Sequence, residues 1–389
     1  MGNNNNREKS LLAKVRARQY AVLKASQTEP DEILDASIDP NEWFFDEKTG
    51  DFYATKPESS TGEKHMVQLY DPTLFKQALD KLEDDRDPRH ELYTNILKTD
   101  PKRSLARVTE EKLRDLEGLK RKFPNFKQVI GHIKDLLELE YYGQNRIIKH
   151  PPILLDGPPG IGKTRLINEV ANVLDVGHVR VIDVASTSNG FVIGGNSTKW
   201  KDGGQGEVTK ALQHNTNANP IIVLDEIDKA SKGDYQVLGS LYSLLEQHTA
   251  SKFIDEALEL PMNCAHIIMF ATANNLNDVP SAIQSRFDIY HVNMPSKEQM
   301  RAVVYSVFGE LLSENDWGLS FNLSLSESVM TLLQQRTPRD LKKTLWKACA
   351  KALQRDKCSI GKRDDLISLM PVDFEENYSP KPTRPIGFY

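Results

Sequence analysis

Residues 156–164 have the types and spacing needed to bind a phosphate group. They read Asp-Gly-Pro-Pro-Gly-Ile-Gly-Lys-Thr, which matches a phosphate-binding loop at every required position. The glycines let backbone N–H groups close around phosphate oxygens, Lys163 can reach the β- and γ-phosphates, and the Thr164 hydroxyl can hold Mg²⁺. The predicted ATP-binding residues of this loop are Gly157, Pro158, Pro159, Gly160, Ile161, Gly162, Lys163 and Thr164.

Two adjacent acidic residues follow an apolar run about 60 residues further along the chain. Residues 221–228 read Ile-Ile-Val-Leu-Asp-Glu-Ile-Asp, so a buried strand would present Asp225 and Glu226 at its carboxyl end. We expect Asp225 to bind Mg²⁺ through water and Glu226 to polarise the attacking water. An exposed acidic strand end is the alternative, but the preceding phosphate loop favours ATP hydrolysis.

Three further polar residues are predicted to act near the γ-phosphate. Asn274 ends the apolar run 267–273, so its amide can hydrogen-bond the phosphate or the water, unless it only caps a turn. Arg286 precedes the last predicted strand and can stabilise charge on the transferring phosphoryl group. Arg339 begins a helix that Thr337 caps. Either arginine, taken alone, could equally form an ordinary surface ion pair.

The elements that must position these residues alternate between strands and helices. Apolar runs without strict alternation indicate strands buried on both faces of a largely parallel sheet. We predict strands at 152–156, 179–185, 220–225, 266–272 and 289–294. A helix is expected directly after the phosphate loop, because Leu166, Ile167, Val170 and Leu174 would share one face. The fold class is therefore α/β, with a five-stranded sheet between helices and a helical lid.

Composition and charge narrow the class of protein. The chain has 389 residues with 39% hydrophobic and 27% charged residues and a net charge of −5. These values are ordinary for a globular protein and argue against broad attraction to nucleic acid. No apolar run reaches the length that spans a bilayer, and the three cysteines form no CxxC pair. We expect a cytoplasmic protein without a membrane partner.

The predicted organisation has four parts. Residues 1–122 form a mixed α+β region for partner or substrate recognition, with a basic amphipathic helix near 7–24, a hairpin at 43–53 and helices at 73–97 and 109–122. Residues 123–295 form the nucleotide-binding subdomain. Residues 296–370 form a lid, with helices at 297–313, 326–335 and 338–354. Residues 371–389 contain four prolines and are expected to be an extended tail that either packs on its own domain or docks on a partner.

The order of these motifs is similar to that of the AAA+ ATPases, and residues 150–345 resemble the ATPase module of Lon proteases. The resemblance is carried by segments 219–220, 241–246, 253–261 and 271–280. It implies that Arg286 is an arginine finger that acts on a neighbouring subunit and that Arg339 is a sensor on the lid. Both roles require a ring of identical subunits, which in this family is a hexamer. Lon has a Ser–Lys peptidase domain after the lid, and we expect none in the length that remains here.

The resemblance also places a pore loop at Trp200 and Lys201. Trp200 would supply the aromatic side chain that grips a polypeptide, although Lys201 and Asp202 depart from the family's apolar and glycine positions. A buried loop residue is the alternative for Trp200. Gly203, Gly204 and Gly206 predict a flexible hinge after it. Residues 251–261 would form a hairpin that serves as a second pore element.

The leading functional prediction is a ring-forming ATPase that remodels or translocates a protein substrate, or gates a partner effector. The alternative is a DNA-associated nucleotide switch of the initiator or transposition type, for which only the helix near 7–24 offers a basic surface. The residues that bracket adenine stay open between 129–132 and 141–143.

Overall fold

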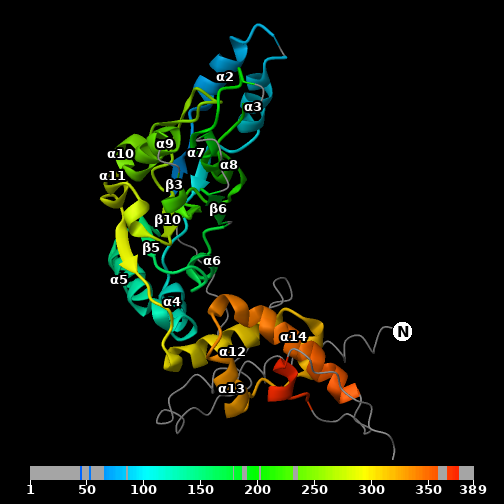
Figure 1. Ribbon diagram of the computed structural model, residues 1–389. Coiled ribbons are helices and arrows are strands. Elements are labelled where there is room, and N and C mark those ends of the chain that lie inside the picture. Colours follow the sequence, from blue (N-terminus) through cyan, green and yellow to red (C-terminus); the bar gives the residue numbers. More distant parts are fainter. Residues whose placement is uncertain are drawn as a thin grey trace, which may run out of the picture. The chain divides into compact units, whose positions relative to one another are not determined.

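The protein is described here by a computed structural model (Figure 1). The structure describes residues 65–84, 86–177, 179–185, 191–200, 203–230, 235–357 and 366–375, with the backbone alone for 44–45, 52–53, 235–238 and 357. The predicted helix near 7–24, the pore-loop residue Lys201 and the segment 376–389 lie outside these residues.

The centre of the molecule is a five-stranded parallel sheet. Its strands are β5 (Ile153–Asp156), β6 (Arg180–Asp183), β7 (Ile221–Asp225), β10 (Ile268–Ala273) and β11 (Asp288–His291), in the order β11-β5-β10-β7-β6. Ala273 pairs with Asp156, and Asp183 pairs with Asp225. The carboxyl ends of these strands therefore meet at one edge of the sheet. The predicted α/β fold with five strands is confirmed.

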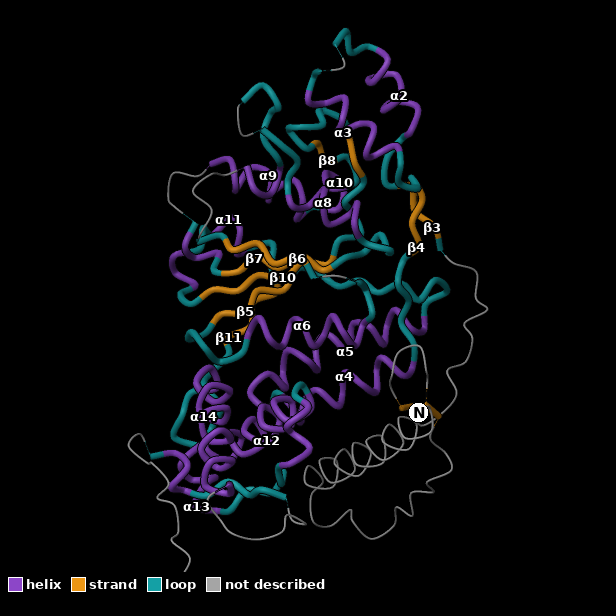
Figure 2. The backbone as a smooth tube through the Cα atoms, turned by 90° about the vertical axis from the view of Figure 1, so that its right-hand side faces the viewer, coloured by secondary structure: helices purple, strands orange, loops and turns teal. Residues whose placement is uncertain are grey.

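Helices cover both faces of the sheet (Figure 2). Because strand side chains alternate between faces, Ile153 and Leu155 of β5 enter one core and Leu154 enters the other. The first core is covered by α4 (Glu110–Lys122), α5 (Lys127–Tyr142) and α6 (Lys163–Leu174). The opposite core is covered by α2 (Pro72–Asp80), α3 (Pro88–Leu97), α7 (Phe191–Gly194), α8 (Glu207–His214), α9 (Tyr235–Leu245), α10 (Gln247–Ala250) and α11 (Ser281–Gln284).

The N-terminal helices differ from the single helix expected over 73–97. The helix is interrupted before Pro88, because proline disfavours helical backbone in the residue that precedes it. Asp87 then caps α3 by accepting a hydrogen bond from the Arg89 amide at 2.9 Å. Phe75 and Ile96 are fully buried in the same core as Leu154 of the sheet. Residues 65–122 thus pack with the nucleotide subdomain in one compact unit, and the predicted boundary at 123 stays a prediction.

Two short antiparallel pairs complete the N-terminal region. Strand β3 (Met66–Gln68) pairs with β4 (Lys102–Ser104) and joins the start of α2 to the segment that leads into α4. Strand β1 (Phe44–Phe45) pairs with β2 (Phe52–Tyr53), with Phe44 opposite Tyr53. The hairpin predicted over 43–53 is therefore present.

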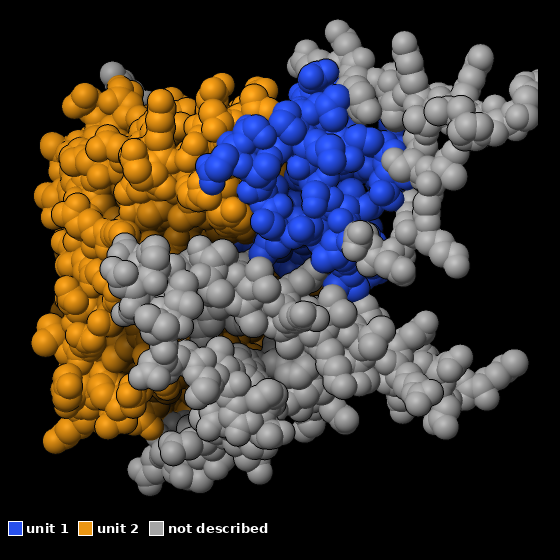
Figure 3. Space-filling model, turned by 90° about the horizontal axis from the view of Figure 1, so that it is seen from below, with its two compact units in different colours: residues 1–64, 307–329, 346–389 blue, residues 65–306, 330–345 orange. Residues whose placement is uncertain are grey.

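The predicted lid helices occur as α12 (Lys297–Ser313), α13 (Glu327–Leu333) and α14 (Pro338–Lys357). The chain divides into two compact units, one of residues 65–306 with 330–345 and one of 1–64, 307–329 and 346–389 (Figure 3). In the second unit, Arg355 forms ion pairs of 3.0 Å with the buried Asp373. This pair helps fold Pro371–Phe374 into a 3₁₀ turn (η7), where the sequence predicted extended chain.

Candidate active site

The phosphate-binding loop runs from the end of β5 to the start of α6. A side chain at Gly157 would place its Cβ 2.2 Å from the Val292 carbonyl oxygen, so only glycine fits beside β11. Gly162 has φ of 102°, in the left-handed region, and caps the N-terminus of α6. The first-turn amides of α6 have no intrahelical acceptor, and the helix dipole adds positive potential at this end. The loop therefore has the conformation of an anion site.

Lys163, the first residue of α6, is largely buried in this loop. Its Nζ atom donates hydrogen bonds to the Gly157 carbonyl at 2.5 Å, the Pro158 carbonyl at 3.2 Å and the Asn274 Oδ1 atom at 2.9 Å. Burial lowers the pKa of Lys163, although nearby carboxylates, including Asp156 and Asp225, favour the charged ammonium. The Lys163 ammonium group is thus held inside the loop, where it would face the phosphates of a bound nucleotide.

Asp225 ends β7 and faces the start of α6. Its Oδ1 atom accepts hydrogen bonds from the Thr164 hydroxyl at 3.2 Å and from the Thr272 hydroxyl at 2.5 Å. Thr164 and Asp225 therefore place two oxygen donors side by side. Oxygen-only donor sets suit Mg²⁺, so the residues predicted to hold this ion fit it chemically.

Glu226 follows Asp225 in a left-handed conformation, with φ of 55°. A non-glycine residue rarely adopts this conformation, and such outliers cluster at functional sites. The Glu226 N–H donates to the Thr272 hydroxyl at 3.0 Å, and its Oε1 atom accepts from Asn274 Nδ2 at 3.3 Å. The Asn274 amide thus connects Glu226 with Lys163. The structure brings the predicted residues of the loop, both carboxylates and Asn274 into one cluster.

Arg339 also lies beside this cluster. The Thr337 hydroxyl accepts from the Asp340 amide at 3.3 Å, as expected for the cap of α14. A Cβ added to Gly160 would lie 3.1 Å from the Arg339 Cβ and 3.4 Å from its Cδ. The arginine stem therefore runs along the phosphate-binding loop.

Among the described residues, Arg286 contacts side chains and a carbonyl that do not belong to the phosphate-binding cluster. Its guanidinium donates from Nη2 and Nε to Glu246 Oε1 at 2.6 and 3.2 Å, and from Nη1 to the Ala282 carbonyl at 2.6 Å. The same group lies over the Tyr242 ring, 4.9 Å from its centroid. Its arginine-finger role, which the sequence predicts for a neighbouring subunit's site, stays a prediction.

Trp200 lies at the tip of a hairpin-like loop and is 69% exposed. At the base of this loop, Asn196 and Gly204 exchange backbone hydrogen bonds of 2.9 and 3.0 Å. A Cβ at Gly203 would lie 2.2 Å from the Ser197 carbonyl oxygen. Gly203 thus allows close backbone packing, and the predicted hinge stays a prediction. Trp200 is separate from the phosphate-binding cluster in sequence, and Lys201 is not described.

The buried Asp255 anchors the end of this loop. The loop from 253 to 262 is closed by β8 (Phe253–Ile254) and β9 (Pro261–Met262), which pair antiparallel as the sequence predicts. Asp255 accepts from the Gly206 amide at 2.8 Å and the Thr209 hydroxyl at 2.7 Å. The Glu256 amide donates to the Gly194 carbonyl at 2.8 Å. The two predicted pore elements are therefore joined by buried hydrogen bonds.

Comparison with known protein families shows which class of ATPase this cluster resembles. Residues 153–294 match the "ATPase family associated with various cellular activities (AAA)". The chain contains an AAA ATPase domain. That domain includes Lys163, Asp225, Glu226 and Asn274, which the structure places together, and the ATPase predicted from the sequence is confirmed. Within the AAA domain, the parallel sheet and phosphate loop thus have the context that the loop motif requires.

The AAA domain is similar to the ATPase part of Lon proteases. The Lon protease of Amoebophilus asiaticus is 28% identical over 176 residues, which cover 41% of this chain and 21% of that protein. The Lon protease of Cytophaga hutchinsonii is 25% identical over 252 residues, or 60% of this chain and 30% of that protein. The chain thus spans about a fifth to a third of the relatives it matches.

A solved structure shows the same fold. The S. cerevisiae Hsp104–casein complex in its extended conformation matches 73% of this chain and 51% of that chain, with a TM-score of 0.50 and 14% identity. In the described part of the chain, each helix is too short or too polar to cross a bilayer.

Sequence reasoning missed two residues at this site. Thr272 is embedded in the apolar run of β10, so only the register of β10 against β7, with Ala271 opposite Leu224, shows that its hydroxyl reaches Asp225. Phe126 lies in the 3₁₀ turn Pro124–Phe126 (η3), and its ring edge is 4.0 Å from a Cβ on Gly162. Neither predicted adenine segment gains support: Val129 and Ile130 are core residues, and Tyr142 is 87% exposed.

Proposed function

We propose that the protein is a homo-oligomeric, hexameric ring ATPase, in which ATP hydrolysis drives the remodelling or translocation of a polypeptide or the gating of a partner effector. The observation that carries this proposal is Trp200, an exposed aromatic residue at the tip of an anchored loop on the AAA domain. Tryptophan is enriched at protein interfaces, so an exposed indole on an anchored loop is available to contact a partner. The likeness to Lon and Hsp104 supports a polypeptide as that partner.

In the proposed reaction, water attacks the γ-phosphorus of ATP while the bond to the β–γ bridging oxygen breaks. Lys163 and the amides of the loop hold the phosphates. Glu226 takes the proton of the attacking water as general base, oriented by the hydrogen bond from Asn274. Thr164 and Asp225 would hold Mg²⁺, which neutralises phosphate charge when bound. Arg339 is proposed to contact the γ-phosphate from the lid.

Arg286 is proposed to complete the site of the adjacent subunit. Its ion pair with Glu246 keeps the guanidinium on the surface formed by α9 and α11, with the side chain 29% exposed. A positive group supplied in trans stabilises charge that develops on the phosphoryl oxygens. ATP hydrolysis would then depend on assembly, which supports the ring.

The experiment that tests this function compares polypeptide remodelling with ATP turnover. Trp200→Ala is expected to abolish the unfolding of a fluorescent, tagged substrate while ATP turnover stays measurable, because the indole grips substrate and lies outside the phosphate cluster. Trp200→Phe, which keeps an aromatic ring, is the matched control and should retain remodelling. Equal remodelling by wild type and Trp200→Ala would refute the pore assignment. Salt-sensitive stimulation of ATPase activity by duplex DNA alone would favour a DNA switch.

A further inference from the structure

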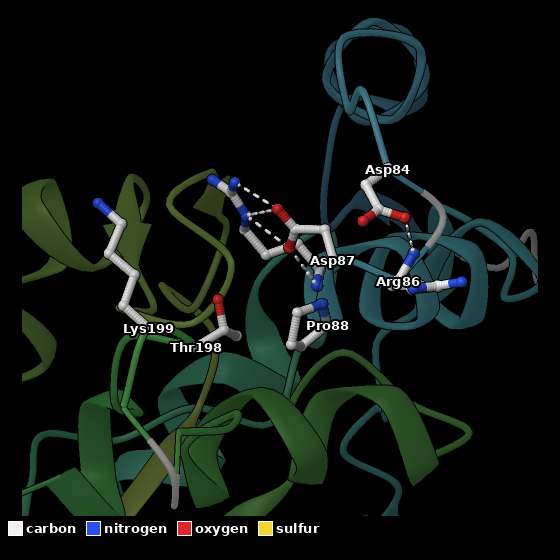
Figure 4. A pocket seen from close by; sticks show the side chains of 7 residues that line it. Asp84, Arg86, Asp87, Pro88, Thr198 and Lys199 are labelled. Atoms are coloured by element: carbon white, nitrogen blue, oxygen red, sulfur yellow. Dashed lines mark hydrogen bonds and ion pairs between the residues drawn. The ribbon is translucent and has the colours of Figure 1, made fainter.

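A polar groove lies next to the Trp200 loop (Figure 4). Its volume is about 310 Å³. Residues 84 and 86–89, from the connection between α2 and α3, form one wall, and Thr198 and Lys199 form the other. Lys199 directly precedes Trp200 in the chain. An N-terminal helical pair outside the matched AAA segment therefore contributes to the surface around the exposed aromatic residue.

The wall formed by α3 is fixed to the second predicted pore element. The buried hydroxyl of Tyr93 donates to the Leu258 carbonyl at 2.8 Å. The Arg89 guanidinium contacts Glu259 Oε2 at 3.2 Å, next to the loop anchored by Asp255. Because Asp255 also holds the end of the Trp200 loop, both walls are connected through the same short hairpin. The groove is thus a built feature and not an accidental gap between loops.

The groove presents two cations that lack an acidic partner among the described residues. Arg89 is already paired with Asp87 at 2.7 Å and with Glu259. Asp84 also lines the groove and accepts a hydrogen bond from the backbone amide of Arg86 at 2.9 Å, which leaves its carboxylate charge in place. The side chains of Arg86 and Lys199, on opposite walls, are both exposed and make no ion pair with a described residue. Anionic side chains of a bound chain would complement them.

We propose that this groove binds an extended polypeptide segment that carries carboxylate side chains, as a second contact beside Trp200. Arg86 and Lys199 pair with the carboxylates, and Thr198 hydrogen-bonds the peptide backbone. The inference rests on the proposed polypeptide substrate and extends it: the ring selects acidic segments at the site where Trp200 grips them. The helical pair α2–α3 is then part of the substrate-binding surface.

The test measures binding of two fluorescein-labelled, unstructured peptides of equal length and equal aromatic content. One peptide carries glutamates and its twin carries lysines at the same positions. Binding is followed by fluorescence anisotropy to Glu226→Gln protein with ATP, in wild-type and Arg86→Glu/Lys199→Glu forms. The double reversal should weaken the acidic peptide about tenfold at low salt, with a smaller effect at high salt, because exposed ion pairs are individually weak and screened. Binding of the lysine peptide should be unchanged or tighter.

The control reverses two exposed cations on the opposite face of the sheet, Arg114→Glu and Arg121→Glu in α4, and should leave both affinities within twofold. Retained binding of the lysine peptide shows that the doubly reversed protein is folded. If the double reversal weakened both peptides equally, or neither, the groove assignment would be wrong. The polypeptide substrate would still stand in that case if Trp200→Ala reduced the binding of both peptides. Failure of wild type to bind either peptide would instead refute the polypeptide substrate, and the groove proposal with it.

Discussion

Thr272 provides the sharpest test of the active-site geometry, because one hydroxyl group serves both carboxylate residues. Thr272→Val keeps the shape of the side chain but removes the donor to Asp225 Oδ1 at 2.5 Å and the acceptor of the Glu226 N–H at 3.0 Å. Thr272 is 1% exposed, so water cannot replace these bonds freely. The left-handed backbone of Glu226 then loses one of its restraints.

The magnitude follows from the two lost bonds. An unsatisfied, largely buried amide costs about 1–3 kcal/mol, and a hydrogen bond to a charged group contributes about 1.5–3 kcal/mol. We expect Thr272→Val to lose about 2–4 kcal/mol of stability, since such terms are not fully additive. If about half of that loss, about 1–2 kcal/mol, falls on the orientation of Glu226, kcat falls about 5- to 30-fold, because each ~1.4 kcal/mol is a factor of ten.

The assay combines phosphate release, which gives kcat, with binding of a fluorescent ATP analogue and thermal unfolding. Thr272→Ser is the matched control, because it keeps the hydroxyl and removes only a methyl group. We expect the serine variant to turn over ATP at close to the wild-type rate. A valine variant with the same kcat as the serine variant would refute the reasoning that Thr272 positions Glu226.

Three other outcomes are expected. Glu226→Gln should bind ATP but lose turnover by on the order of 10²-fold or more, because it removes the general base; rapid phosphate release would contradict this role. Arg286→Ala should bind ATP and lose turnover by on the order of 10³-fold, and mixing it with Glu226→Gln protein should restore activity, whereas an inactive mixture would argue against a shared site. Burial lowers the pKa of His150 to about 4, from 6.5. Between pH 6.5 and 4 the imidazole is therefore protonated in the unfolded chain but neutral in the folded one, so the free energy of unfolding should fall as the pH falls through this range. The loss should be about 1–2 kcal/mol, since the ring is only half-buried; a His150→Gln variant with an unchanged pH dependence would disprove it.

Much of the site was predictable because its signals are local. The spacing from Gly157 to Thr164 fixes a loop conformation, and the apolar runs before Asp225 and Asn274 identify adjacent strand ends. Parallel pairing then brings their side chains together without further information. The sequence placed Arg339 at the start of a helix capped by Thr337, whereas its role as a lid sensor followed from a family resemblance.

Other features depend on tertiary contacts that no local pattern contains. Thr272 looks like one more residue of an apolar strand until the register of β10 against β7, with Ala271 opposite Leu224, places it beside Asp225. The close approach of the Ser197 carbonyl to Gly203, which leaves no room for a side chain, could not be read from the glycine-rich sequence. The break between α2 and α3 was readable from Pro88, whereas the attachment of α3 to the β8–β9 hairpin required the fold.

The burial of Phe75, Tyr93 and Ile96 against the sheet sets where the polypeptide can be cut without damage. A shortened chain beginning at 123 would strip apolar cover from both sides of the sheet, because α2 and α3 pack on one side and α4 on the other. One beginning at 65 would keep every one of these contacts. The early helices thus belong to the same compact unit as the nucleotide site, so a partner that binds them contacts that unit directly.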